Sequence, residues 1–299
     1  MNLGYACINM TLGEHKPKIT TNRSMIKKTF KEKGIPYASE LGIQNSRDLV
    51  EIIKWNNKNG INFFRLTSDL FPWASEYNLT ELPHYNLIKN ILGDVGALAN
   101  KYRQRITSHP GPFNVLVSPK QHVVENTIND LTMHGEVFDM LGLSRTPYNK
   151  INIHCNGVYG DKIAAMDRFC KNFEKLPESV QTRLTVENDD KASMYSVSDL
   201  IYIHERIGIP IVFDYHHHKF CTGDLSEEEA LKLAVTTWGE IKPVVHYSES
   251  KALHENNDEL KPQAHSDYIK EIPNTYGLDL DVMVEAKAKE LSILPFINS

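Results

Sequence analysis

Short apolar runs alternate with longer amphipathic stretches along the whole chain. The apolar runs are rich in β-branched and aromatic residues, which is typical of buried strands. Eight strands are predicted, at Leu3–Ile8, Ile61–Thr67, Arg105–Ser108, Lys150–Cys155, Leu184–Val186, Pro210–Phe213, Pro243–Tyr247 and Leu280–Glu285. Between them, apolar residues recur at intervals of three and four, as on the buried face of a helix. The helical stretches include Arg47–Asn57, Tyr85–Tyr102, Val123–Leu141, Asp161–Phe173, Val197–Ile207 and Glu227–Trp238.

Eight strand–helix units in succession predict an α/β fold in which parallel strands close into a single-domain TIM (β/α)8 barrel. The length of 299 residues suits one such barrel, and we expect a single domain over residues 1–299. An open, doubly wound sheet is the alternative, but the first strand is not followed by the glycine-rich phosphate turn of that fold. The polar segment His254–Asp267 is predicted to form a long functional loop before the last strand.

The polar run that ends the sixth strand carries the first sign of chemistry. Asp214 follows the apolar strand, and His216, His217 and His218 come directly after Tyr215. Carboxylates and imidazoles are the ligand pair that binds zinc, manganese or iron in proteins. Taken alone, the run is explained equally well by a polar loop with chance histidines or by a surface chelating patch.

Five other predicted strands end in the same residue types. In a parallel barrel, the carboxyl ends of the strands converge on the face that carries the active site. The six strand-end residues are His109, His154, Glu187, Asp214, His246 and Glu285. A single histidine at a strand end is more often an ordinary hydrogen-bonding residue, and Glu187 or Asp214 could cap a helix or a turn. Six such coincidences at equivalent places make a metal centre the better hypothesis.

Two loop histidines, His217 and His265, could join this set. Eight ligands are too many for one tetrahedral site and suit two or three divalent ions. The net charge of −5 argues against a broad basic surface for nucleic acid, but it does not exclude a local groove. Bound divalent ions would be the largest local charges there and could outweigh the carboxylates that hold them.

The composition favours a cytoplasmic protein. No apolar run approaches the roughly 20 residues that span a bilayer, so we expect no membrane segment. No secretory signal is visible at the N-terminus. The four cysteines lack C-x-x-C spacing, which favours free thiols in a reducing compartment.

An ordered set of motifs runs nearly from one end of the chain to the other. It comprises Leu3–Cys7 with Asn9, Phe64–Pro72, Ser108–Gly111, His154 with Gly157–Lys162, Glu187–Asp190, Asp214 with His217 and His218, His246–Ser248, Ala264–His265 and Asp281–Lys287. Each motif is weak by itself, but with them in this order the chain resembles the UV damage endonucleases, barrel enzymes related to the endonuclease IV class of apurinic-site nucleases. The resemblance implies cleavage of damaged double-stranded DNA immediately 5′ to UV photoproducts, such as pyrimidine dimers and 6-4 photoproducts, leaving a 3′-hydroxyl.

The resemblance also implies three divalent ions, with manganese the first candidate and zinc, cobalt or magnesium the others. The ligand sets carried over are His109, His154 and Glu187 for the first ion, Glu187, Asp214, His246 and Glu285 for the second, and His217 with His265 for the third. Glu187 would bridge two ions, and Glu187, Asp214 and Glu285 are the candidate catalytic carboxylates. His216 and His218 have no metal role in this assignment. Ions roughly 3.5 to 4 Å apart can clamp both the attacking and the leaving oxygen of a phosphodiester.

Contacts with DNA are expected around the same face. Tyr5 and Asn9 match family positions that probe the damaged bases, although an ordinary core tyrosine is the alternative interpretation of Tyr5. Phe113 is a further candidate for lesion contact, but Pro112 precedes it where the family often has glutamine, so one polar probe is lost. Phosphate contacts are expected from Arg65, Lys162 and Lys287.

One further departure from the family concerns a lysine near the metals. Some members carry a chemically modified lysine two residues before the histidine that matches His246. Here that position is Val244, and the nearest lysine, Lys242, is not expected on that side of the site.

Three alternatives stay open. The same barrel with histidines and carboxylates serves metal-dependent sugar isomerases, which act on small molecules without DNA. An apurinic-site endonuclease would show no preference for UV lesions. A non-catalytic binder of damaged DNA would be favoured only by an incomplete ligand set, and all eight positions are filled.

We expect a monomer that flips damaged nucleotides out of the stack, which costs least at a lesion.

Overall fold

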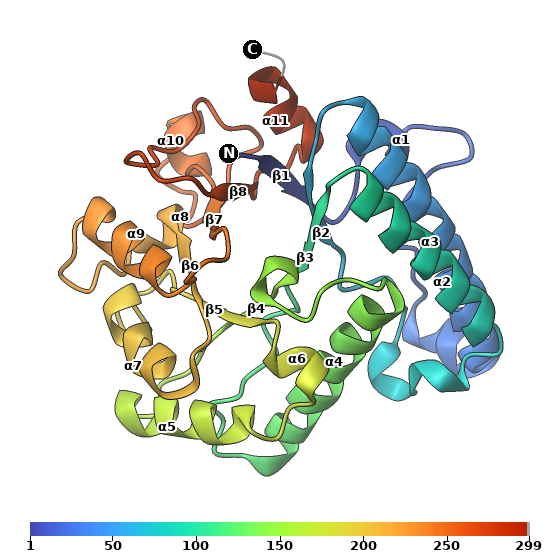
Figure 1. Ribbon diagram of the computed structural model, residues 1–299, viewed down its shortest axis with the longest axis horizontal. Coiled ribbons are helices and arrows are strands. Elements are labelled where there is room, and N and C mark those ends of the chain that lie inside the picture. The colour runs from blue at the N-terminus through green and yellow to red at the C-terminus, as the bar shows by residue number, and fades with distance from the viewer. Residues whose placement is uncertain (298–299) are drawn as a thin grey trace.

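The computed structural model describes residues 1–297 and contains a closed barrel of eight parallel strands, with the helices arranged around its outside (Figure 1). Each strand pairs with the next along the chain, and the last pairs with the first. The strands are β1 (Leu3–Ala6), β2 (Phe63–Leu66), β3 (Arg105–Ser108), β4 (Ile151–His154), β5 (Leu184–Glu187), β6 (Ile211–Asp214), β7 (Val244–Tyr247) and β8 (Asp281–Val284). The predicted barrel fold is confirmed, and each strand overlaps its predicted segment.

The helices follow the strands in sequence and cover the barrel. They are α1 (Met10–Gly13), α2 (Lys27–Lys58), α3 (Tyr85–Lys101), α4 (Gln121–Met140), α5 (Lys162–Phe173), α6 (Glu178–Gln181), α7 (Val197–Ile207), α8 (Tyr215–His218), α9 (Glu227–Thr236), α10 (Lys251–Glu255) and α11 (Glu290–Ile297). Short 3-10 turns lie at Ala74–Glu76, Leu79–Glu81 and Pro147–Asn149. Within residues 1–297, no helix is both long enough and apolar enough to cross a membrane.

Helix α2 is much longer than the predicted Arg47–Asn57. Its first turns are largely exposed and polar, so no apolar period marked them in the sequence. Gly34 interrupts the helical geometry with a φ of 61°, and Pro36 follows it. A φ in this range is easy only for glycine, so the chain can change direction there and continue as the helix that packs on α3.

The interior of the barrel is apolar on one side and polar on the other. Ala6, Phe63, Val212, Val244 and Met283 form, with Trp238, a buried cluster separate from the larger core between strands and helices. On β3 to β5, Ile106, Ile153 and Val186 belong to that larger core. Because side chains alternate along a strand, the polar residue next to each of these three faces the barrel interior. These are Thr107, Asn152 and Thr185, all fully buried.

A buried ion pair closes the end of the barrel where the strands begin. Arg105 Nη1 lies 3.1 Å from an oxygen of Asp281, and both side chains are almost completely buried. Lys242 Nζ lies 3.2 Å from Asp281 and 2.8 Å from Asp279. Lys242 therefore lies at the opposite end of β7 from His246, as expected from the sequence.

The segment His254–Asp267, predicted as a long loop, starts within α10 and is tied back to the barrel. An isolated antiparallel bridge joins Ser250 to His265. The amide of Lys251 also donates to the carbonyl of Ala264 at 2.7 Å. These contacts hold His265 beside the strand ends.

Candidate metal centre

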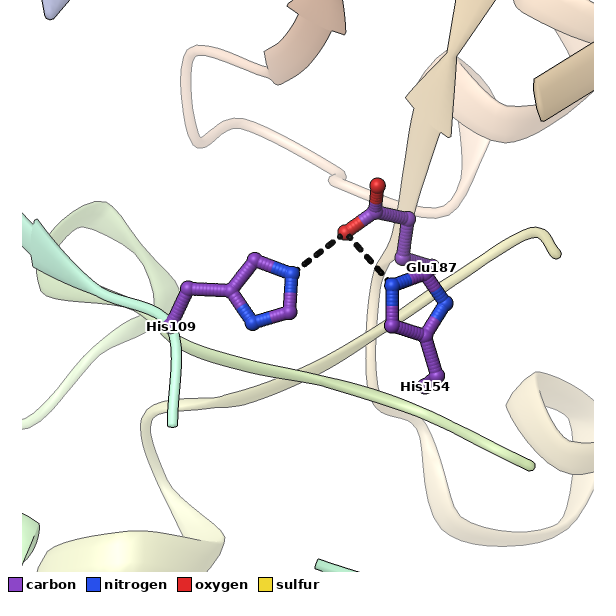
Figure 2. Close-up of side chains that lie close together, drawn as sticks. All are labelled: His109, His154 and Glu187. Atoms are coloured by element: carbon purple, nitrogen blue, oxygen red, sulfur yellow. Dashed lines mark hydrogen bonds and ion pairs between the residues drawn. The ribbon is translucent and has the colours of Figure 1, made fainter. Parts of the chain in front are cut away.

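Four imidazoles surround the carboxylate of Glu187, which ends β5 and is fully buried. His109 Nε2 and His154 Nε2 lie 3.0 and 3.7 Å from its Oε2 atom. His246 Nδ1 and His217 Nδ1 lie 3.1 and 3.5 Å from its Oε1 atom. Figure 2 shows how His109 and His154 point toward the same carboxylate oxygen from neighbouring strand ends. One carboxylate is thus placed where it could bridge ions held by different histidines.

The predicted ligands form three groups in which the candidate ligand atoms lie within 4.8 Å of one another. His109, His154 and Glu187 form the group predicted for the first ion. The residues predicted for the second ion do not form one group: Asp214 lies with Glu187 and His217, whereas Glu285 lies with His109 and His246.

Local contacts explain why Asp214 and Glu285 fall into different groups. Asp214 Oδ1 accepts a hydrogen bond from the backbone amide of His217 at 2.8 Å and so caps α8, which brings the His217 side chain to it. Glu285 accepts a hydrogen bond from the guanidinium of Arg65 on β2. The capping role considered for Asp214 in the sequence and its place among the ligands are therefore compatible.

His217 and His265, predicted to share a third ion, are oriented in the same way. The Nδ1 atom of His217 lies 2.9 Å from the carbonyl of Asn188, and that of His265 lies 3.0 Å from the carbonyl of Glu285. A histidine that donates its Nδ1 proton to a carbonyl leaves Nε2 free for a metal ion. The two rings are 6.5 Å apart, and His265 belongs to none of the three groups found among residues 1–297.

His216 and His218 are buried beside aromatic rings and also lie outside these groups. His216 packs against Phe220 with ring centroids 5.3 Å apart, and His218 packs against Phe213 at 5.2 Å. Strand and helix geometry therefore turns only the middle histidine of the run toward Glu187.

The buried charges shift one another's pKa values in opposite directions. Burial raises the pKa of the Asp214 carboxyl to about 6. Burial also opposes the charged form of His217, but the carboxylates of Asp214 and Glu187 raise its pKa to about 9. Burial lowers the pKa of His246 to about 4. Although burial opposes the charge on Glu187, His246 and His154 hold the pKa of its carboxyl well below the usual range.

Several buried polar atoms of this cluster lack a hydrogen-bond partner within the described part of the chain. They are Asp214 Oδ2 and the pair Glu187 Oε1 and His246 Nδ1, which lie 3.1 Å from each other without hydrogen-bond geometry. A buried polar atom without a partner is rare in native proteins, and an ion is one of the few groups that satisfies it. Oxygen and imidazole nitrogen donors together suit manganese or zinc. The residues present therefore fit divalent metal ions.

A buried lysine beneath the cluster was missed by the sequence analysis. Lys150 immediately precedes β4, is fully buried, and has its Nζ atom 3.1 Å from His246 Nε2. Burial lowers the pKa of its amine to about 7. Lys150 and Asn152 stand four and two residues before His154, so strand alternation alone could have placed all three on one face.

A cationic hollow of about 400 Å³ borders the cluster beside Glu285 and His265. Arg65 and Lys287, both predicted to contact phosphate, line it together with Lys289, which the sequence analysis missed. The third predicted phosphate contact, Lys162, instead pairs with Asp199 at 2.9 Å. Three cationic side chains thus lie together beside the ligands, near the carboxyl end of β8.

Phe113 and Tyr5, both predicted to contact the lesion, differ sharply in exposure. Phe113 is 88% exposed between β3 and α4 and lines a second hollow of about 600 Å³. The charged residues that line this hollow are Asp69, Glu76 and Asp130, which disfavour a phosphate backbone there.

Tyr5 is fully buried and points toward α2. Its hydroxyl donates to Asn56 at 2.8 Å and accepts from Asn9 at 2.9 Å. Asn9 is itself buried and caps α1 through the amide of Leu12. These contacts fit the alternative interpretation of Tyr5 as a core residue, and a lesion contact by either side chain would require them to break.

Comparison with known proteins agrees with this geometry. The sequence model of the family described as UV-endonuclease UvdE matches residues 1–299. A UV-damage endonuclease of Schizosaccharomyces pombe is 37% identical over 303 residues, which cover 97% of this chain and 49% of that protein. The chain thus spans about half the length of this relative. The crystal structure of SacUVDE superposes with a TM-score of 0.86 at 31% identity, covering 100% of this chain and 97% of the other.

Sugar epimerases share the fold at a greater distance. A D-psicose 3-epimerase from Clostridium cellulolyticum superposes with a TM-score of 0.54 at 12% identity, covering 96% of this chain and 85% of the other. At this level of identity the likeness concerns the barrel alone.

Proposed function

Because the chain belongs to the UV-endonuclease family, we propose that it is a DNA repair endonuclease that nicks damaged double-stranded DNA immediately 5′ to UV photoproducts. The reaction proposed is metal-dependent hydrolysis of a phosphodiester that leaves a 3′-hydroxyl. The observation that carries this proposal is the carboxylate of Glu187 among four imidazoles, with unpartnered buried atoms around it.

Three divalent ions, with manganese the first candidate, are proposed for this centre. His109, His154 and Glu187 would hold the first, Asp214, His246 and Glu285 would complete the second with Glu187, and His217 and His265 would hold the third. When bound, such ions supply hydroxide near neutral pH and compensate charge on the attacking and leaving oxygens. Glu187, Asp214 and Glu285 would hold these ions in place, and their positions would determine which oxygens of the phosphodiester the ions reach.

The remaining residues would bind and orient the DNA. Arg65, Lys287 and Lys289 line one hollow beside the ligands and would hold the phosphate backbone there. Phe113, with its exposed ring, would insert beside the lesion and stabilise the unstacked duplex. Unstacking costs less at a damaged step, so this insertion would favour damaged over intact DNA. That the enzyme acts as a monomer stays a prediction.

The test compares three plasmids: UV-irradiated, depurinated and untreated. With manganese, we expect the purified protein to nick the irradiated plasmid and to leave the untreated plasmid largely intact. The nicks should support extension by a DNA polymerase without end processing, because a 3′-hydroxyl is left. Equal nicking of irradiated and untreated DNA would overturn lesion specificity, and nicking of only the depurinated plasmid would favour an apurinic-site endonuclease.

A further inference from the structure

A short chain of hydrogen bonds supports Glu187 from inside the barrel. The side-chain amide of Asn152 donates to Glu187 Oε2, and the hydroxyl of Thr185 donates to Asn152 Oδ1 at 2.7 Å. All three side chains are fully buried. The register of β4 and β5 pairs Asn152 with Thr185 and His154 with Glu187, so the contacts follow from the backbone pairing.

Asn152 differs in kind from the other partners of Glu187. The imidazole nitrogens of His109 and His246 that face the carboxylate are the atoms that would bind ions. A nitrogen that binds an ion no longer donates a hydrogen bond to Glu187. The amide nitrogen of Asn152 has no lone pair to offer a metal ion, so its hydrogen bond persists when ions are bound.

Thr185 determines how reliably the amide faces Glu187. Its hydroxyl satisfies Asn152 Oδ1, which keeps the NH2 group of the amide turned toward the carboxylate. Without that hydroxyl, Oδ1 would be buried without a partner, and the amide would gain by turning away. A turned amide would present an oxygen to a carboxylate that needs a donor.

We propose that Asn152 and Thr185 are positioning residues that fix the orientation of Glu187 by a hydrogen bond to Oε2, so that Oε2 faces His109 and His154 and Oε1 faces His246. Among residues 1–297, the amide of Asn152 is the one partner of the Glu187 carboxylate that could not itself bind an ion, because the other close contacts of both oxygens are with imidazole nitrogens. This inference rests on the metal-dependent function proposed above and assigns two fixed supports to its bridging carboxylate. The opposite side of the barrel interior is apolar, so a buried polar pair is not required to fill the barrel.

The decisive experiment replaces Thr185, which contacts Asn152 and acts on Glu187 only through it. Manganese affinity is measured by titration calorimetry and by the electron paramagnetic resonance signal of free manganese, on the full chain without DNA. Thr185→Val keeps the shape but removes the hydroxyl, and we expect about tenfold weaker binding, the lower end for groups that orient ligands. Thr185→Ser restores the hydroxyl and should restore the affinity. Asn152→Ala removes the donor itself and should weaken binding by about ten- to a hundredfold.

Thr107→Val is the matched control. Thr107 is also fully buried inside the barrel, on β3, but its hydroxyl has no hydrogen-bond partner within the described residues. We expect its manganese affinity to equal that of the wild type. In nicking assays, Thr185→Val should lower kcat and leave KM for irradiated DNA unchanged, because no DNA contact is lost.

The positioning role and the proposed function fail in different ways. Equal manganese affinities of the wild type, Thr185→Val and a folded Asn152→Ala would overturn the positioning role alone. A loss in Thr185→Val that Thr185→Ser does not rescue, or that Thr107→Val shares, would also overturn it. A wild-type protein that binds no manganese at all would overturn the metal-dependent reaction itself.

Discussion

Both ends of the barrel bury charged side chains, but these side chains are paired in different ways. Where the strands begin, Arg105 faces Asp281, and its guanidinium also donates to the carbonyls of Tyr148 and Lys242 at 2.6 and 2.9 Å. Where the strands end, acidic and imidazole groups crowd around Glu187, and several of their atoms have no hydrogen-bond partner within residues 1–297. Charge is compensated within the chain at the first end, whereas the second end groups side chains that could bind metal ions.

This difference suggests that the buried charges at one end stabilise the fold and that those at the other end serve the function. A buried charge that the chain itself pairs contributes to folding, and losing its partner is costly. Buried groups with opposed pKa shifts and unpartnered atoms are typical of functional sites. TIM barrels carry their active sites at the carboxyl end of the strands, whereas the other end contributes to stability. Substitutions at the two ends should therefore affect different measurements.

The largest expected effect is on catalysis at the carboxyl end. Glu187→Gln keeps the shape of the side chain but removes its negative charge, so the bridge proposed between two ions would be lost. We expect the rate of nicking irradiated plasmid at saturating manganese to fall about ten-thousandfold, or about 5.4 kcal/mol. Circular dichroism should show an unchanged fold. A variant that keeps more than about a hundredth of the wild-type rate would remove Glu187 from the bridging role.

The next effect is on stability at the opposite end. Arg105→Met leaves Asp281 buried without its guanidinium partner and should cost about 3–5 kcal/mol of the free energy of unfolding, measured by urea denaturation. Lys242→Met, which removes a partly exposed partner of the same carboxylate, should cost about 1 kcal/mol or less. At 20 °C the folded fraction of both variants should keep the wild-type kcat. A tenfold fall in kcat in folded protein would contradict the separation between the two ends.

Manganese should stabilise the protein through the carboxyl end alone. At a fixed concentration that is one hundred times the Kd at pH 6.5, the gain at that pH is about 2.7 kcal/mol, measured as a rise in Tm. The gain should grow between pH 6.5 and 8.5. In the folded protein without ions, the pKa of His217 is about 9, so its side chain still carries a proton in this pH range. In the unfolded chain the same side chain has a pKa of about 6.5 and loses its proton above that pH.

The sign of this pH dependence follows from proton linkage. The stability that protonated His217 contributes to the ion-free protein is fully present below about pH 6.5 and is lost as the pH rises through 9. An ion must displace that proton, so affinity rises with pH, toward a limit of about tenfold per pH unit. Arg105→Met should show the same pH-dependent gain as the wild type. A gain that is flat from pH 6.5 to 8.5 would exclude His217 as a ligand.

The fold and the ring of strand-end residues could be predicted because both depend on residues that are close together in the sequence. Apolar strands and the residue that ends each one are neighbours in the chain, and barrel closure then brings the six ends together. The grouping of Asp214 with His217 depends on a helix cap, and the pairing of Glu285 with Arg65 depends on two distant strands. Those contacts require the three-dimensional arrangement.

Other residues lay within reach of the same reasoning. Asn152 could be placed on the face of His154 by alternation, but its contact with Glu187 depends on the register between β4 and β5. Alternation also indicates the direction of Tyr5. Its neighbour Ala6 packs inside the barrel, so Tyr5 faces the helices rather than the DNA.

The smallest expected effect concerns the charged rim of the carboxyl end. Lys289→Gln removes one cation from the hollow beside Glu285, without touching a proposed metal ligand. We expect binding of irradiated duplex, measured by fluorescence anisotropy, to weaken by about 1 kcal/mol, and the slope of log K against log salt to fall by about 0.9. Lys58→Gln makes the same change of charge at the exposed end of α2, just before β2 begins, and should leave the slope unchanged. Equal slopes for both variants would mean that DNA does not distinguish the two ends of the barrel by charge.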